Sequence, residues 1–147
     1  MAGGGFTVAL SQQCPLRPEY VLGLLNSKLL FWRLRTLSNV FRGGWITCTK
    51  QYFGELPIRP IDFANLADKS RHDRLVALVE QISALRIQHA TARTPQEQTA
   101  LTRQIAAADT QIDHLVYDLY DLSESEIRIV ESSGKESAVA TASGGPE

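Results

Sequence analysis

Residues 75–119 have the sequence LVALVEQISALRIQHATARTPQEQTALTRQIAAADTQIDHLVYDL, which decides the fold. Apolar residues alternate three and four positions apart on both sides of a short break, as in two packed helices. The seam residues are Leu75, Leu78, Ile82, Leu85, Leu101, Ile105, Ala108, Ile112, Leu115, Leu119 and Leu122. At the break, Thr94, Pro95 and Glu97 have the spacing of a capping box with proline in the first turn. We therefore predict an antiparallel helical hairpin over residues 65–131.

The sequence after the hairpin predicts little further structure. Ser123 and Glu126 repeat the capping-box spacing, which indicates a last short helix over residues 124–130. The remaining sequence, SSGKESAVATASGGPE, is small, polar and aperiodic. We expect residues 132–147 to form a disordered tail.

The sequence before the hairpin predicts a small, partly β module. Residues 1–15 should be partly disordered, with a short strand at FTVAL, residues 6–10. A helix should run from Pro18 to about Leu37, and residues 45–49 (WITCT) should form a strand after a Gly-Gly turn. The core face of this helix should comprise Val21, Leu22, Leu25, Leu29 and Trp32. With residues 16–64 as this module, we predict an α+β fold.

The charge is distributed unevenly along the chain. Residues 16–60 hold seven basic and two acidic side chains, a net charge of +5, whereas residues 61–131 hold seven basic and twelve acidic ones, a net charge of −5. The basic half favours phosphate contact, although an ordinary solvated face can also carry a net charge of +5 over 45 residues. The acidic half favours packing on another protein, or on a second copy, over lying along DNA.

Composition excludes several function classes. A chain of 147 residues fits one domain, and it has neither a membrane-length apolar run nor a signal-peptide pattern, so we expect a cytoplasmic protein without membrane contact. Cys14 and Cys48 form no metal-ligand pattern with the three histidines, and reduced, buried thiols are expected. His72 and Asp73 at the start of the first long helix fit a solvated turn better than an acid–base pair. We expect no metal and no cofactor.

The hairpin predicted from Arg42 to Tyr52 holds most of the candidate DNA-contacting residues, because it combines hydrogen-bond donors with flat aromatic rings. The candidates are Arg42, Thr47, Thr49, Lys50 and Gln51, together with Lys28 and Arg35 on the preceding helix. Trp45 and Tyr52 could offer surfaces to sugars or bases, but packing in the core is the favoured interpretation. Asn26 and Ser27 could likewise contact DNA or bind their own backbone.

Five phrases carry a family resemblance. They are GLLNSKLL (residues 23–30), FRGG (41–44), TKQYFGELPI (49–58), DKSRHDRLVALVEQI (68–82) and IDHLVYDLY (112–120). In this order and spacing, the chain from about residue 20 to 131 resembles the TaqI-like C-terminal specificity domain. That domain belongs to adenine-specific DNA methyltransferases and the restriction-modification enzymes built on them. The resemblance implies target recognition, with double-stranded DNA and a methyltransferase or endonuclease catalytic domain or subunit as partners. It also implies that the helical hairpin of residues 65–131 is a spacer or docking element.

Two features qualify what the resemblance implies. The chain lacks any Pro-Pro pair, whereas a catalytic loop for adenine amino methylation needs Asn/Asp-Pro-Pro-aromatic, so we expect a non-catalytic part of such a system. In the family, the part that reads bases precedes GLLNSKLL, and here about twenty residues precede it. The alternative from a different class is a helical-hairpin module that binds protein and not DNA.

Overall fold

The structure, a computed structural model, describes residues 7–38 and 49–142. In these ranges every regular element is a helix. The helices are α1 (Pro18–Leu25), α2 (Lys28–Leu37), α3 (Lys50–Gly54), α4 (Leu66–Thr91), α5 (Pro95–Leu119) and α6 (Glu124–Ala142).

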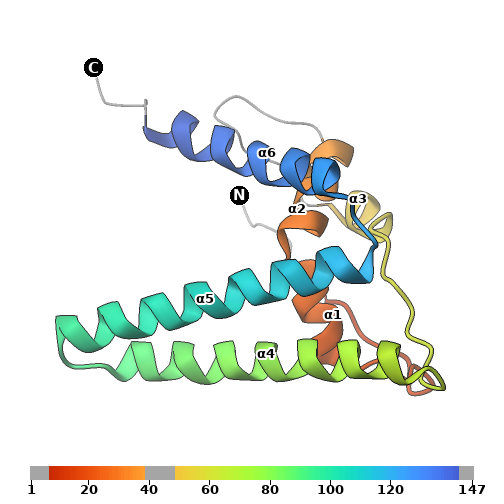
Figure 1. The fold of residues 1–147 in the computed structure, drawn as a ribbon, viewed down its shortest axis with the longest axis horizontal. Coiled ribbons are helices and arrows are strands. Elements are labelled where there is room, and N and C mark those ends of the chain that lie inside the picture. The colour runs from red at the N-terminus through yellow and green to blue at the C-terminus, as the bar shows by residue number, and fades with distance from the viewer. Residues whose placement is uncertain (1–6, 39–48, 143–147) are drawn as a thin grey trace.

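Helices α4 and α5 form the long antiparallel hairpin that dominates the molecule (Figure 1). Asn65 caps α4 by accepting from the backbone N–H groups of Ala67 and Asp68, and the capping box of Thr94 and Glu97 is formed as predicted. The predicted seam is buried along most of its length, whereas Leu101 and Ile105 toward the tip, and Leu122 beyond the end of α5, are only partly buried. The buried seam residues are Leu75, Leu78, Ile82, Leu85, Ala108, Ile112, Leu115 and Leu119.

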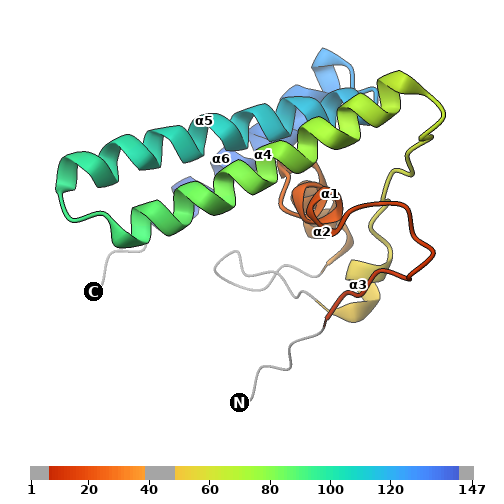
Figure 2. The same cartoon turned by 90° about the horizontal axis from the view of Figure 1, so that it is seen from below.

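Helix α1 crosses the hairpin steeply and completes the core (Figures 1 and 2). Its Tyr20 and Leu24 are fully buried and join the cluster around Leu75 and Val116. This burial corrects the predicted core face: Val21 is buried, but Leu22 is 49% exposed, and Leu25, Leu29 and Trp32 are only partly buried. The predicted core face assumes one continuous helix, whereas the structure has two separate helices, α1 and α2.

The helix predicted from Pro18 to Leu37 is broken at Asn26 and Ser27. The Ser27 hydroxyl donates to the carbonyl of Leu24, 2.6 Å away, and accepts from the backbone N–H of Leu30 as the N-cap of α2. Because Ser27 caps a new helix that starts in a different direction, α1 and α2 bury different faces. Ser27 is fully buried, so its role is to bind backbone.

The prediction of an α+β fold is wrong for the described residues, which contain no strand. Residues 7–10 form no regular element, and Phe6 and residues 45–48 lie outside the described ranges. Thr49, predicted as the strand's end, is the extended N-cap of α3, and Lys50–Gly54 form a short helix. Residues 50–52 are therefore helical where the predicted hairpin would end. Tyr52 and Phe53 are half-buried there and do not belong to the core cluster, so core packing of Tyr52 stays a prediction.

The last helix is longer than predicted. Glu126 accepts from the Ser123 backbone N–H at 2.7 Å, and the Ser123 hydroxyl accepts from the Glu126 N–H, so the second capping box is present. However, α6 continues to Ala142, and residues 132–142, predicted as part of a disordered tail, are helical. None of the helices in the described part of the chain has the length and hydropathy needed to cross a lipid bilayer.

Candidate nucleic-acid interface

The candidate DNA-contacting residues fall on two neighbouring helices and on a segment that the structure does not describe. Arg42 and Thr47 lie outside the described residues, as do the Gly-Gly turn and Trp45. Thr49, Lys50 and Gln51 lie at the start of α3, which packs against α2. Lys50 and Gln51 are exposed, whereas the hydroxyl oxygen of Thr49 is buried.

Lys28 is held by the hairpin. Its backbone N–H donates to Oδ1 of Asp113 at 2.9 Å, and its ammonium lies 3.5 Å from Oδ2. Asp113 is therefore a carboxylate from α5 at the N-terminus of α2, where the helix dipole favours negative charge. Burial nevertheless raises the pKa of Asp113, because desolvation outweighs the contacts with Lys28. The Lys28 side chain remains 56% exposed.

Arg35, two turns further along α2, contacts α6. Its Nη1 donates to the carbonyl oxygen of Ser133 at 3.0 Å. Lys28 and Arg35 therefore lie on one side of α2, while Leu30 and Leu34 on another side are buried. Both cations already have partners in the chain.

Gly23 makes the crossing of α1 over α4 possible. A Cβ atom at this position would lie 2.9 Å from Cγ2 of Val79 and 3.0 Å from Cδ1 of Leu75. The two helices can approach this closely only because Gly23 has no side chain. The only signal of this in the sequence is a glycine within an apolar helix.

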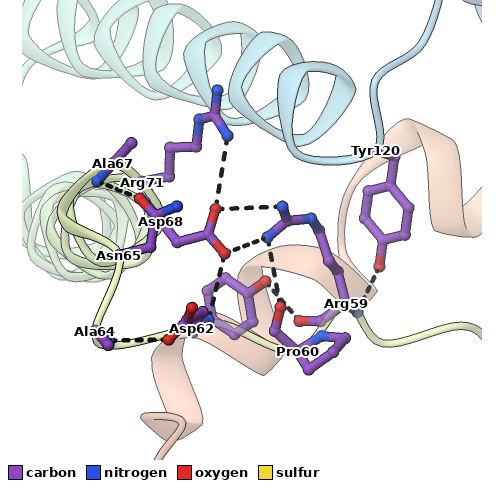
Figure 3. Close-up of polar contacts among 10 residues, drawn as sticks. Arg59, Pro60, Asp62, Ala64, Asn65, Ala67, Asp68, Arg71 and Tyr120 are labelled. Carbon is purple, nitrogen blue, oxygen red and sulfur yellow. Dashed lines mark hydrogen bonds and ion pairs between the residues drawn. The ribbon is translucent and has the colours of Figure 1, made fainter.

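A polar network fixes the chain between α3 and α4 (Figure 3). Arg59 forms a bidentate pair with Asp68, both N···O distances being 3.2 Å, and Asp68 also accepts from the backbone N–H of Asp62. The Tyr20 hydroxyl donates to the carbonyl of Arg59, and the Tyr120 hydroxyl accepts from the Arg59 N–H and donates to the carbonyl of Pro57. The network thus joins α1, α4 and the end of α5 through one loop.

The charges of this network are mutually stabilised. The hydrogen bond from Arg59 lowers the pKa of Asp68, and the same bond raises the pKa of Arg59. Burial raises the pKa values of Tyr20 and Tyr120, so both hydroxyls stay protonated and able to donate. Arg59 is one of the seven basic residues of residues 16–60, but its guanidinium is bound to Asp68 in this network.

His72 is also structural, and its interpretation as part of a solvated turn is wrong. The side chain is 2% exposed, and its ring lies 4.9 Å from that of Tyr20 and 5.0 Å from that of Phe63. Nε2 accepts from the backbone N–H of Arg17, and Nδ1 lies 2.9 Å from the Asp73 carboxylate. This arrangement attaches the start of α1 to α4 and leaves no free nitrogen for chemistry.

The described residues contain no cluster of histidine, cysteine or acidic side chains arranged to hold a metal ion. Cys14 is a half-buried free thiol, and Cys48 lies outside the described ranges.

The phrases that carry the family resemblance meet in space at these joints. GLLNSKLL contains Gly23 and Lys28, which contact the phrases DKSRHDRLVALVEQI and IDHLVYDLY through Val79 and Asp113. The end of TKQYFGELPI contacts IDHLVYDLY where Tyr120 binds Pro57. In the described part of the chain, therefore, the phrases mark contacts that hold helices together.

The chain is similar to part of a restriction-modification enzyme. Over 114 residues it is 28% identical to the type II restriction enzyme and methyltransferase RM.Eco57I of Escherichia coli. The match covers 76% of this chain and 11% of that enzyme, so the chain spans a small fraction of the length of its curated relative. No family model matches the sequence, and no solved structure matches it.

Proposed function

We propose that this chain is a non-catalytic part of the DNA target-recognition region of a restriction-modification adenine methyltransferase, for which it supplies a helical platform. The observation that carries the proposal is the similarity to a restriction enzyme and methyltransferase over 114 residues. The phrases that carry the family resemblance lie where helices contact one another, which supports a platform role because such contacts set where neighbouring elements lie.

The platform places the basic half of the chain at one side of the hairpin. Helix α2 is fixed to α5 by Asp113, and α3 packs against α2, so both ends of the segment between Ser38 and Thr49 are at this side. That segment carries Arg42 and Thr47 in sequence, and Lys50 follows it at an exposed position. Phosphate contacts from these residues would position a duplex without reading its sequence.

The hairpin is suited to a protein partner. From residue 104 to 127 the chain has no lysine or arginine, and Asp109, Asp118 and Asp121 of this stretch are exposed. Such a surface repels phosphate, so we place the catalytic partner, and not DNA, along this part of the molecule.

The second candidate function is a helical-hairpin module that binds protein without DNA. It is favoured by large exposed apolar side chains along α4 and α6, namely Leu66 (82% exposed), Ile87 (68%) and Ile129 (54%). DNA binding separates the two candidates, because the second predicts none.

A salt titration of duplex binding tests the proposal. If about three to five phosphates are neutralised, the logarithm of affinity should fall with that of salt concentration at a slope of about −3 to −4.5. Replacing Arg42 and Lys50 with alanine should flatten the slope by about 2. Arg103→Ala is the matched control, because Arg103 is an exposed cation on α5 outside the candidate surface. Undetectable binding at low salt would leave the protein-binding module as the better function.

A further inference from the structure

Helix α6 covers one face of α2. The two helices are in contact, and α2 lies between α5 and α6 (Figure 1). Val130 is 5% exposed and is the buried side chain among residues 124–133, where Ile127 is half-buried. Near the C-terminal end of α2, Arg35 donates a hydrogen bond to the carbonyl of Ser133 in α6.

The covered face is a stripe of cations and aromatic rings. Lys28, Phe31, Trp32 and Arg35 are spaced at i, i+3, i+4 and i+7, which places them on one side of a helix. With Val130 and Glu131 of α6, they line a groove of about 240 Å³. Phe31 is 49% exposed although it lies beside a covering helix. The face is therefore incompletely covered, and we name it the α2 stripe.

The two helices have complementary charge. Helix α2 contains Lys28, Arg33 and Arg35 and no acidic residue, a net charge of +3. Residues 124–133 of α6 contain three glutamates and Arg128, a net charge of −2. At the groove itself, the charged residues are Lys28 and Arg35 of α2 and Glu131 of α6. A carboxylate therefore lies beside the cations to which a phosphate would bind.

We propose that the α2 stripe is a second contact surface for the phosphate backbone of duplex DNA, and that α6 occupies it as an intramolecular competitor. This inference rests on the proposed function and adds a regulatory feature to it. A phosphate would replace the Ser133 carbonyl at Arg35 and attract the exposed ammonium of Lys28 away from Asp113. The backbone N–H of Lys28 would keep its bond to Asp113, so that α2 stays fixed on the hairpin.

Helix α6 has few buried contacts with α2, as expected of a competitor that can be displaced. Because it is tethered to the same chain, its effective concentration at the α2 stripe is high. The Glu124–Arg128 pair and the Ser123 capping box lie within α6 and its N-cap, and they do not bind it to α2. Val130 is therefore the position at which docking can be weakened with least change elsewhere.

The test uses the full chain and two matched substitutions. Val130→Asp places a charge on the buried side of α6, and Ile129→Asp places the same charge at a neighbouring position that is 54% exposed. A Trp45→Phe background leaves Trp32 as the one tryptophan, so its emission reports whether α6 covers the stripe. Val130→Asp should shift Trp32 emission to the red and increase its quenching, and Ile129→Asp should change neither.

Duplex binding by the same variants then tests the competition. Val130→Asp should bind roughly tenfold more tightly at low salt, with a salt slope steeper by about 1 to 2. Adding Lys28→Ala and Arg35→Ala should abolish this gain. If Trp32 becomes exposed and the parent binds DNA but affinity does not rise, the competition is disproved and the proposed function stands. If Trp32 becomes exposed and no variant binds DNA, the proposed function itself fails, and a variant that leaves Trp32 unchanged refutes a releasable α6.

Discussion

At the scale of single residues, the joints between helices depend on one glycine and two carboxylates. Gly23 lets α1 approach Val79, Asp113 holds the start of α2, and Asp68 holds Arg59. The pKa values of the two carboxylates are shifted in opposite directions. Burial raises the pKa of Asp113, whereas the bond from Arg59 lowers the pKa of Asp68.

Gly23→Ala should destabilise the protein. The new methyl group would meet Val79, whose β-branched side chain is stiff in a helix, and overpacking costs about 1–3 kcal/mol. This cost should exceed the gain in helix propensity, which is about 1 kcal/mol. Gly54→Ala is the control, because a Cβ there has nothing within 4 Å. Urea unfolding should rank Gly23→Ala below the parent and Gly54→Ala level with or above it; the reverse order would show that the crossing is not tight.

The two carboxylates should give opposite pH dependences of stability. Because the folded pKa of Asp68 is lowered, its stabilisation is present above the ordinary aspartate pKa of about 3.9 and is lost as pH falls. Asp68→Asn should therefore be less stable than the parent near pH 7 and should approach it in acid. Because the folded pKa of Asp113 is raised, its ionisation costs stability as pH rises from about 4. Asp113→Asn should gain stability relative to the parent over that rise, as measured by thermal unfolding from pH 3 to 7; parallel curves would contradict both assignments.

At the scale of elements, the hairpin could be predicted from sequence because its information is local. The heptads and the Thr94 capping box lie in one continuous stretch, and both are present in the structure. The break at Ser27 was missed because a serine between apolar residues can either bind backbone or face solvent, and only the packing of α1 on α4 decides. The network of Arg59, Asp68 and Tyr120 includes bonds between residues up to 63 positions apart, which no local pattern specifies.

The short elements were predicted less well, for a related reason. The β-branched and aromatic composition of residues 45–49 indicates a strand, of which residues 45–48 lie outside the described residues. Thr49 is the N-cap of α3, and Lys50–Gly54 are helical where the sequence indicated the end of a hairpin. Of the candidate site, Lys50 and Gln51 are exposed, and their contact with DNA stays a prediction. Lys28 and Arg35 have partners that only the fold reveals.

Ile112→Asp tests the hairpin as an element. Ile112 is 6% exposed in the seam between α4 and α5, and an unpaired charge buried there costs several kcal/mol. Helicity by circular dichroism and the thermal midpoint should both fall. Gln111→Asp, at the exposed neighbouring position, introduces the same charge and should leave both close to the parent. Equal behaviour of the two variants would mean that the seam is not buried.

At the scale of the whole molecule, the chain combines a basic side around α2 and α3 with an acidic stretch along the end of α5. Under the proposed function, DNA contacts the basic side and a catalytic partner contacts the acidic stretch. The chain covers 11% of the length of RM.Eco57I, and a platform of this size would act beside the rest of such an enzyme.

The most direct measurement of this role is adenine methylation in cells that co-express the chain with a related methyltransferase lacking the corresponding region. The chain should restore methylation at defined sites, Ile112→Asp should abolish the restoration, and the purified chain alone should transfer no methyl group. Restoration that is unaffected by Ile112→Asp, or methyl transfer by the purified chain free of other enzymes, would contradict a non-catalytic helical platform for target recognition.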